Sequence, residues 1–255
     1  MKTRTLFLFF LLFSISVLGQ EVSNNQDTIP QKRKNVVKFL PENLIFNSLS
    51  FEYERKFSPK SSFILGIGLA SPKSFASKFG ISNDNNKITN DAFSTMSVRA
   101  AYRHYAGHHV RPVGFYFSPY LKYQKLSANA DNYRTVTDPQ YGSTSYNEKY
   151  DVSATTMNFG IQWGVQFLIA KRVAIDFYFL GIEAGLANIT ATVKSDDANS
   201  IDVIYNGVND NIQQLPSFLR DKIKATKVGS NEVDVKGNSI PYPWLRSGIS
   251  IGIAF

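Results

Sequence analysis

The sequence predicts an all-β fold: an eight-stranded antiparallel up-and-down transmembrane β-barrel with long extracellular loops. Three observations support this prediction. Several segments alternate large apolar residues with polar or small ones at a period of two, the polar phase carries charged residues, and short connections alternate with long ones. The chain of 255 residues has 14% aromatic residues and no cysteine, which excludes disulfide scaffolds, thiolate metal sites and cysteine nucleophiles.

The amino terminus predicts export. Lys2 and Arg4 precede an apolar run from Leu6 to Leu18, which has the length of a signal-peptide core and is short for a membrane span. No later run of eighteen apolar residues occurs, so a conventional transmembrane helix is excluded from the mature chain. We expect a signal peptide over 1–19, a flexible periplasmic leader over 20–34 and the barrel over 35–255. Export without cysteine indicates a bacterial envelope, and the barrel pattern indicates the outer membrane of a Gram-negative bacterium.

Strands are expected wherever the period of two holds. In the segment from Thr155 to Ile169, large apolar residues alternate with Asn, Gly and Gln. The recurrent glycine and glutamine indicate a barrel interior on that phase, because a hydrophobic core would need bulk there. Similar patterns begin near residues 46, 61, 93, 112, 154 and 173, and a last strand runs from Trp244 to Phe255. An even-numbered barrel needs an eighth strand, and Asn35 to Leu40 is the candidate.

The connections predict which end of the barrel faces which side. Turns at 58–60, 106–111 and 170–172 are short, whereas 71–92, 127–153 and 190–243 are long. Outer-membrane barrels keep their short turns in the periplasm, so residues 41–43 are expected at the outer rim.

In the strand after Val173 the apolar phase changes near Gly181, which predicts a bulge that returns Glu183 to the interior. In the last loop, a helix is expected to begin at Pro216 and either to cap the barrel mouth or to contact lipopolysaccharide.

Charged residues on the inward phase predict a barrel-interior charge network. Eight strands enclose a space that side chains just fill, so a wide aqueous pore is not expected. Buried charges need partners of opposite sign, and in particular we expect a contact between Glu183 and Arg246. The network should place Glu54, Arg103 and Asp176 low, Glu52 and Arg99 near the middle, and Glu183 level with Arg246 above. A proton or ion path is the functional alternative to structural packing.

The last strand carries a second candidate feature. The residues on its apolar face are Ile249, Ile251, Ile253 and Phe255. An aromatic end in phase with that face resembles the terminal signal by which the outer-membrane assembly machinery recognises its clients.

Several stretches together support a family resemblance. They are Asn35–Lys38, Leu49–Lys56, Tyr102–Tyr105, Gly114–Tyr123 and Pro241–Gly248, with the end at Phe255. In these segments the chain resembles the small Bacteroidetes-type outer-membrane β-barrel proteins of a family of unknown function. The resemblance covers most of residues 35–255. It implies a barrel fold and outer-membrane placement, and it supplies no catalytic residues.

Catalysis is not expected from these residues. His104, His108 and His109 are the only histidines, and the last two lie in a predicted periplasmic turn without cysteine or an acidic neighbour, so neither a metal site nor a cofactor is expected. The formal charge of +8 is spread through strands and turns, which argues against nucleic acid as a partner. We expect outer-membrane lipid, lipopolysaccharide and the assembly machinery as partners, with the surface ligand open. The expected role is structural or surface interaction, and the alternative is a lipid-modifying barrel enzyme or narrow channel.

Overall fold

The protein is all-β, with its strands joined in one antiparallel sheet. A computed structural model describes residues 33–46, 48–73, 86–109, 111–138 and 142–255. The strands in these ranges are β1 (Asn35–Phe39), β2 (Ser48–Lys56), β3 (Ser61–Lys73), β4 (Asn86–Tyr105), β5 (Gly114–Asp138), β6 (Gly142–Ile169), β7 (Val173–Ser195), β8 (Ile223–Val228) and β9 (Glu232–Ala254). The helices are the 3₁₀-helix η1 (Pro41–Phe46), α3 (Ala198–Gln213) and α4 (Ser217–Arg220). The expected signal peptide and most of the expected leader lie outside the described residues.

Eight of the strands form a closed ring of hydrogen-bonded pairs. Each strand from β1 to β7 pairs with the next, β7 pairs with β9, and β9 pairs with β1. The closing contact runs from Val36 opposite Ala254 to Phe39 opposite Ile251. Asn35 and Phe255 extend it by exchanging backbone hydrogen bonds of 3.1 and 2.9 Å. The strand expected at Asn35 to Leu40 is therefore present, and eight strands complete the ring as predicted.

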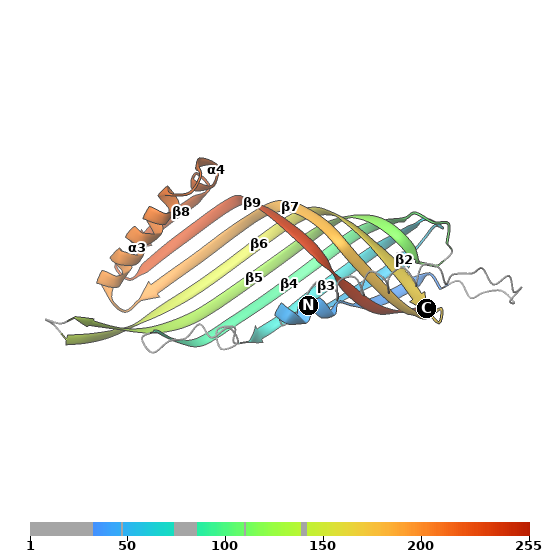
Figure 1. Cartoon of the computed structure of the whole chain (residues 1–255). Coiled ribbons are helices and arrows are strands. Elements are labelled where there is room, and N and C mark those ends of the chain that lie inside the picture. The colour runs from blue at the N-terminus through green and yellow to red at the C-terminus, as the bar shows by residue number, and fades with distance from the viewer. Residues whose placement is uncertain (1–32, 47, 74–85, 110, 139–141) are drawn as a thin grey trace, which may run out of the picture. The chain divides into compact units, whose positions relative to one another are not determined.

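The two ends of the ring differ. One end, called the turn end below, carries the short connections 57–60, 106–113 and 170–172. At the other end, called the far end, β5, β6, β7 and β9 continue well past β2 and β3 (Figure 1). Residues 41–43, expected to turn at a rim, open η1 at the far end.

The expectation of long loops was wrong over much of its length. Residues 127–138 and 142–153 continue β5 and β6, which pair as far as Asp138 opposite Gly142. These segments contain Tyr, Thr and Val, which favour strands, but they contain at least as many Ser, Asn and Asp and lack a continuous apolar phase. A search for apolar alternation misses a strand that is polar on both faces. Beyond residue 190, β7 continues to Ser195, and β8 forms a hairpin with β9.

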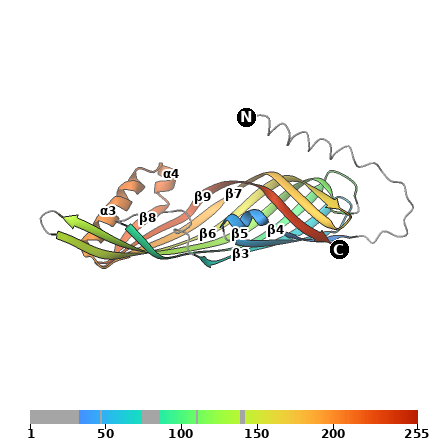
Figure 2. The same cartoon turned by 60° about the horizontal axis from the view of Figure 1, so that its bottom comes forward.

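A helix begins directly after Pro216, as expected, but it is short, and a longer helix that was not expected precedes it. The longer helix, α3, ends before that proline, and the helix that follows Pro216 has only four residues. α3 contacts β7, β8 and β9 with Ile201 and Ile212 buried, and it lies alongside β8 (Figure 2). In the part of the chain that the structure describes, no helix is both long enough and apolar enough to cross a membrane.

The ring has an inverted distribution of polarity. Along β2, inward residues are buried and outward residues are exposed in strict alternation. The outward residues across the ring are large and apolar, and Ile67 and Phe159 are each 55% exposed. The inward residues include lysine, arginine, aspartate and glutamate, several of them with less than 2% exposure. The expected phase change in β7 is confirmed as a bulge between Tyr178 and Gly181, beyond which Glu183 is buried.

Inward glycines make room for inward tyrosines on neighbouring strands. A Cβ atom at Gly160 would overlap the ring of Tyr120, and one at Gly164 would overlap the hydroxyl of Tyr116. Their strands pair directly, so each tyrosine ring lies across the strand that carries the glycine. The glycines therefore mark places that a cross-strand ring fills.

Candidate functional site

The inward charges near the turn end form one buried network, called the turn-end cluster below. Its charged members are Lys38, Glu54, Arg103 and Asp176, from β1, β2, β4 and β7. Strand alternation places each of them on the inner face, and all four side chains are at most 1% exposed. Glu54, Arg103 and Asp176, which the sequence analysis expects at one level, meet in this cluster.

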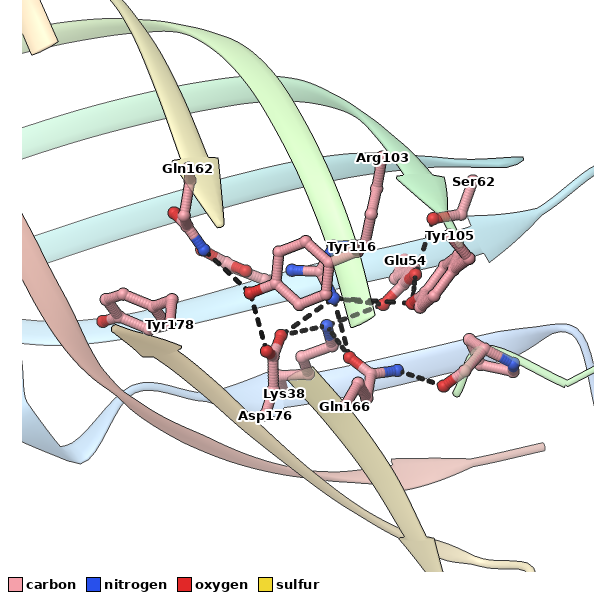
Figure 3. Close-up of polar contacts among 12 residues, drawn as sticks. Lys38, Glu54, Ser62, Arg103, Tyr105, Tyr116, Gln162, Gln166, Asp176 and Tyr178 are labelled. Carbon is pink, nitrogen blue, oxygen red and sulfur yellow. Dashed lines mark hydrogen bonds and ion pairs between the residues drawn. The ribbon is translucent and has the colours of Figure 1, made fainter. Parts of the chain in front are cut away.

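Each cation of the turn-end cluster contacts both carboxylates. The Lys38 ammonium nitrogen lies 2.6 Å from a Glu54 oxygen and 2.9 Å from an Asp176 oxygen. The Arg103 guanidinium lies 3.3 Å from Glu54 and 2.9 Å from Asp176 (Figure 3). The cluster thus contains two positive and two negative charges in alternation. This balance removes the cost of a single uncompensated buried charge.

Neutral polar groups surround the four charges. Tyr105 and Ser62 donate hydrogen bonds of 2.5 and 2.6 Å to Glu54, and Tyr116 donates one of 2.8 Å to Asp176. The Gln166 carbonyl oxygen accepts from Lys38 at 2.5 Å and from Arg103 at 2.8 Å.

The Arg103 guanidinium also stacks over the Tyr116 ring, with its carbon 3.6 Å from the ring centroid. Side chains from the seven strands β1 to β7 therefore converge in the ring interior at this level (Figure 3). The arrangement fills the ring interior at this level with paired polar groups.

A second set of inward charges lies nearer the far end, in two groups. Glu52 forms an ion pair with Arg99, which donates a 2.9 Å hydrogen bond to Gln162. Glu183 accepts from Tyr120 at 2.8 Å and from Asn158 at 2.9 Å, and it lies 3.3 Å from the Lys122 ammonium. Glu52 and Arg99, which the sequence analysis expects near the middle, thus pair with each other.

The predicted contact between Glu183 and Arg246 was wrong. Arg246 lies opposite Gly181 in the pairing of β7 with β9, and its guanidinium is directed to Glu52, 3.7 Å away, and to the Tyr178 hydroxyl, 3.4 Å away. Counting residues along strands ignored the stagger between neighbouring strands, which changes the neighbours across the ring.

Sequence reasoning missed several members of the network. Lys38 stands in a strand of only five residues, too short for alternation to reveal its inner face. Lys122, Tyr116 and Tyr120 fall on the inward phase of β5, but their sequence gives no indication of specific partners. Tyr105 continues the inward phase of β4 beyond Arg103, so extending that phase by one more step would have found it.

A cavity of about 390 Å³ lies above these pairs, toward the far end. Its lining includes the charged residues Glu52, Arg99, Lys122 and Arg246, together with Leu40, Leu126 and Trp244. It is bounded by β2, β3, β4, β5 and β9, and by the segment around η1. The interior is therefore filled near the turn end and hollow above.

The outward residues of β9 end at the turn end. Ile251 and Ile253 are 47% and 64% exposed, Phe255 is 58% exposed, and Ile249 is half-buried on the same face. Within the described ranges, no group of three or more histidine, aspartate or glutamate side chains is arranged to hold a metal ion.

Comparison with known proteins returned no relatives. No family model matches the chain, and neither a curated protein nor a solved structure is similar to it.

Proposed function

We propose that this chain is an integral outer-membrane protein whose ring is a closed, eight-stranded transmembrane β-barrel. The observation that carries the proposal is the inverted polarity of the ring, with apolar side chains exposed outward and charges paired inward. In water such an outer face would be a large exposed apolar surface, which soluble monomers rarely tolerate. In a bilayer the same face lies against lipid, and strand pairing around the ring satisfies the backbone hydrogen bonds of the strands, except along residues 239–250 of β9, which have no strand partner on the edge that faces β1 among the described residues.

The apolar face has the height that a bilayer requires. Along β6 the outward residues are apolar from Ile169 to Met157, about 40 Å of strand at about 3.3 Å per residue. A strand tilt of about 45° reduces this to a belt about 28 Å tall, close to the usual apolar band of about 25 Å.

The belt ends abruptly in one row across three neighbouring strands. Tyr123, Met157 and Leu186 lie side by side as its last outward members. The next outward row is Lys125, Thr155 and Asn188. A common boundary on separate strands supports a membrane interface at this level, with the far end outside the cell and the turn end in the periplasm.

The proposed role is structural or one of surface interaction, without a wide pore. The turn-end cluster fills the interior near the turn end, which supports a closed barrel. The extensions of β5, β6, β7 and β9 and helix α3 would stand outside the membrane and supply the surface for partners. Lipid and lipopolysaccharide would contact the belt.

Reconstitution into planar bilayers tests this proposal. The folded protein should insert, show the mobility difference between heated and unheated samples that barrels show on gels, and give no conductance of porin size. Steady porin-size conductance would contradict the closed interior. Failure to enter lipid while remaining folded in water would contradict the membrane assignment.

A further inference from the structure

The ring is closed along only part of its height. On the edge of β9 that faces β1, the pairing with β1 covers Ile251 to Ala254, and the pairing with β8 covers Glu232 to Gly237. Asn238 donates a backbone hydrogen bond of 3.0 Å to the Lys222 carbonyl, and within the described chain residues 239–250 of β9 have no strand partner on this edge. η1 contacts β9 there, and Glu42 accepts a hydrogen bond from the Tyr178 hydroxyl. The six-residue 3₁₀-helix η1 thus stands where a paired strand would complete the wall.

This unpaired edge is protected against a further strand. The hydrogen bonds between Asn35 and Phe255 show that odd-numbered residues of β9 direct their backbone groups toward the edge. Pro241 and Pro243 fall on that phase and have no N–H to donate. Prolines at such positions prevent strand addition, so the occupant of the edge is not an added peptide strand.

The cavity of about 390 Å³ lies behind this edge. Trp244, on β9 itself and 50% exposed, lines it together with Leu40, the last residue before η1. Its cationic lining comes from Arg99, Lys122 and Arg246. The cavity therefore joins a cationic inner side to an apolar margin at the unpaired edge.

The cations of the cavity have donor groups to spare. Arg246 makes one long hydrogen bond of 3.4 Å, and its nearest carboxylate, Glu52, is 3.7 Å away. The Nε of Arg99 is buried without a hydrogen-bond partner among the described residues. The neighbouring carboxylates already accept hydrogen bonds, Glu52 from Arg99 and Glu183 from Tyr120. An incoming group with several anionic oxygens would satisfy these donors, as phosphates do with arginine.

We propose that this cavity binds an amphiphilic anion. Its phosphate-type head lies between Arg246, Arg99 and Lys122, and its apolar chain passes Trp244 and leaves along the unpaired edge of β9. The exit of the ligand's apolar chain into lipid rests on the proposed membrane function. The binding of the head rests only on the cavity and its donors.

The chain has two tryptophans, so replacing either one leaves the other as the only tryptophan that reports on binding. The Trp163→Phe variant, folded in uncharged dodecyl maltoside micelles, keeps Trp244 as the reporter and is titrated with dodecyl phosphate. A saturable change in its fluorescence is expected. Arg246→Gln should weaken binding about tenfold, since it removes charge-assisted hydrogen bonds. Lys224→Gln, on β8 outside the cavity lining, is the matched control and should leave the affinity unchanged.

Four results would overturn the proposal: equal affinity for dodecanol, equal affinity for inorganic phosphate, an unchanged affinity in Arg246→Gln, or the same response from Trp163 in the Trp244→Phe variant. Circular dichroism separates this failure from failure of the proposed function. A chain without β-structure in micelles argues against the barrel, whereas a folded chain with an unresponsive Trp244 argues only against the ligand.

Discussion

Removing one charge from the turn-end cluster should destabilise the protein strongly. Glu54→Gln preserves side-chain size but changes the cluster from two positive and two negative charges to a net charge of +1 in a fully buried site. Lys38 and Arg103 would each lose a carboxylate oxygen, at 2.6 and 3.3 Å. Breaking a buried ion pair by removing one partner costs about 3–5 kcal/mol of unfolding free energy. Urea unfolding from uncharged vesicles, followed by tryptophan fluorescence, measures this loss.

Two further variants separate charge imbalance from loss of packing. Glu232→Gln is the matched control, because Glu232 pairs at 3.0 Å with Lys194, whose side chain is 52% exposed. Its unfolding midpoint should not move, since exposed pairs contribute little. Adding Lys38→Met to Glu54→Gln restores neutrality and should recover part of the lost stability. Equal midpoints for Glu54→Gln and Glu232→Gln would refute the reasoning, as would a double variant that is less stable than Glu54→Gln alone.

The remaining predictions concern glycines and a turn. Gly160→Ala should cost about 1–3 kcal/mol of unfolding free energy, because its methyl group overlaps the Tyr120 ring. Gly207→Ala, in α3 with open space around its Cβ position, should gain about 0.5–1 kcal/mol, and a loss there would contradict the argument. Ala170 and Lys171 hold φ angles of 49° and 62°, so replacing them with Asn-Gly should raise stability by about 1 kcal/mol in the same assay. An unchanged midpoint would show that the turn carries no strain.

The sequence was informative where one face of a strand is apolar and the other polar. That pattern located the strands of the ring and assigned Glu54, Arg103 and Asp176 to one interior level. It failed at the far end, where residues such as Glu148 and Ser153 give both faces of β6 a polar character and alternation carries no signal.

The side-chain contacts across the ring could not be predicted from the sequence, for a different reason. The partner of Arg246 depends on strand stagger and on the bulge between Tyr178 and Gly181, and these change which side chains meet. The partners of Lys38 likewise come from β2, β6 and β7, which lie far from it in sequence. Local patterns therefore predicted the face of each residue but not its neighbours.

Site-directed spin labelling along β6 tests the central claim most directly, and the absence of cysteine makes single-cysteine variants straightforward. With the protein in lipid vesicles, labels at Met157, Phe159 and Ile169 should be accessible to oxygen dissolved in the bilayer. A label at Asn158, which is buried, should be accessible neither to oxygen nor to a water-soluble nickel reagent. A label at Ser153 should be accessible to the nickel reagent. High nickel accessibility and low oxygen accessibility at Phe159 would contradict the account, because its outward face would then lie in water.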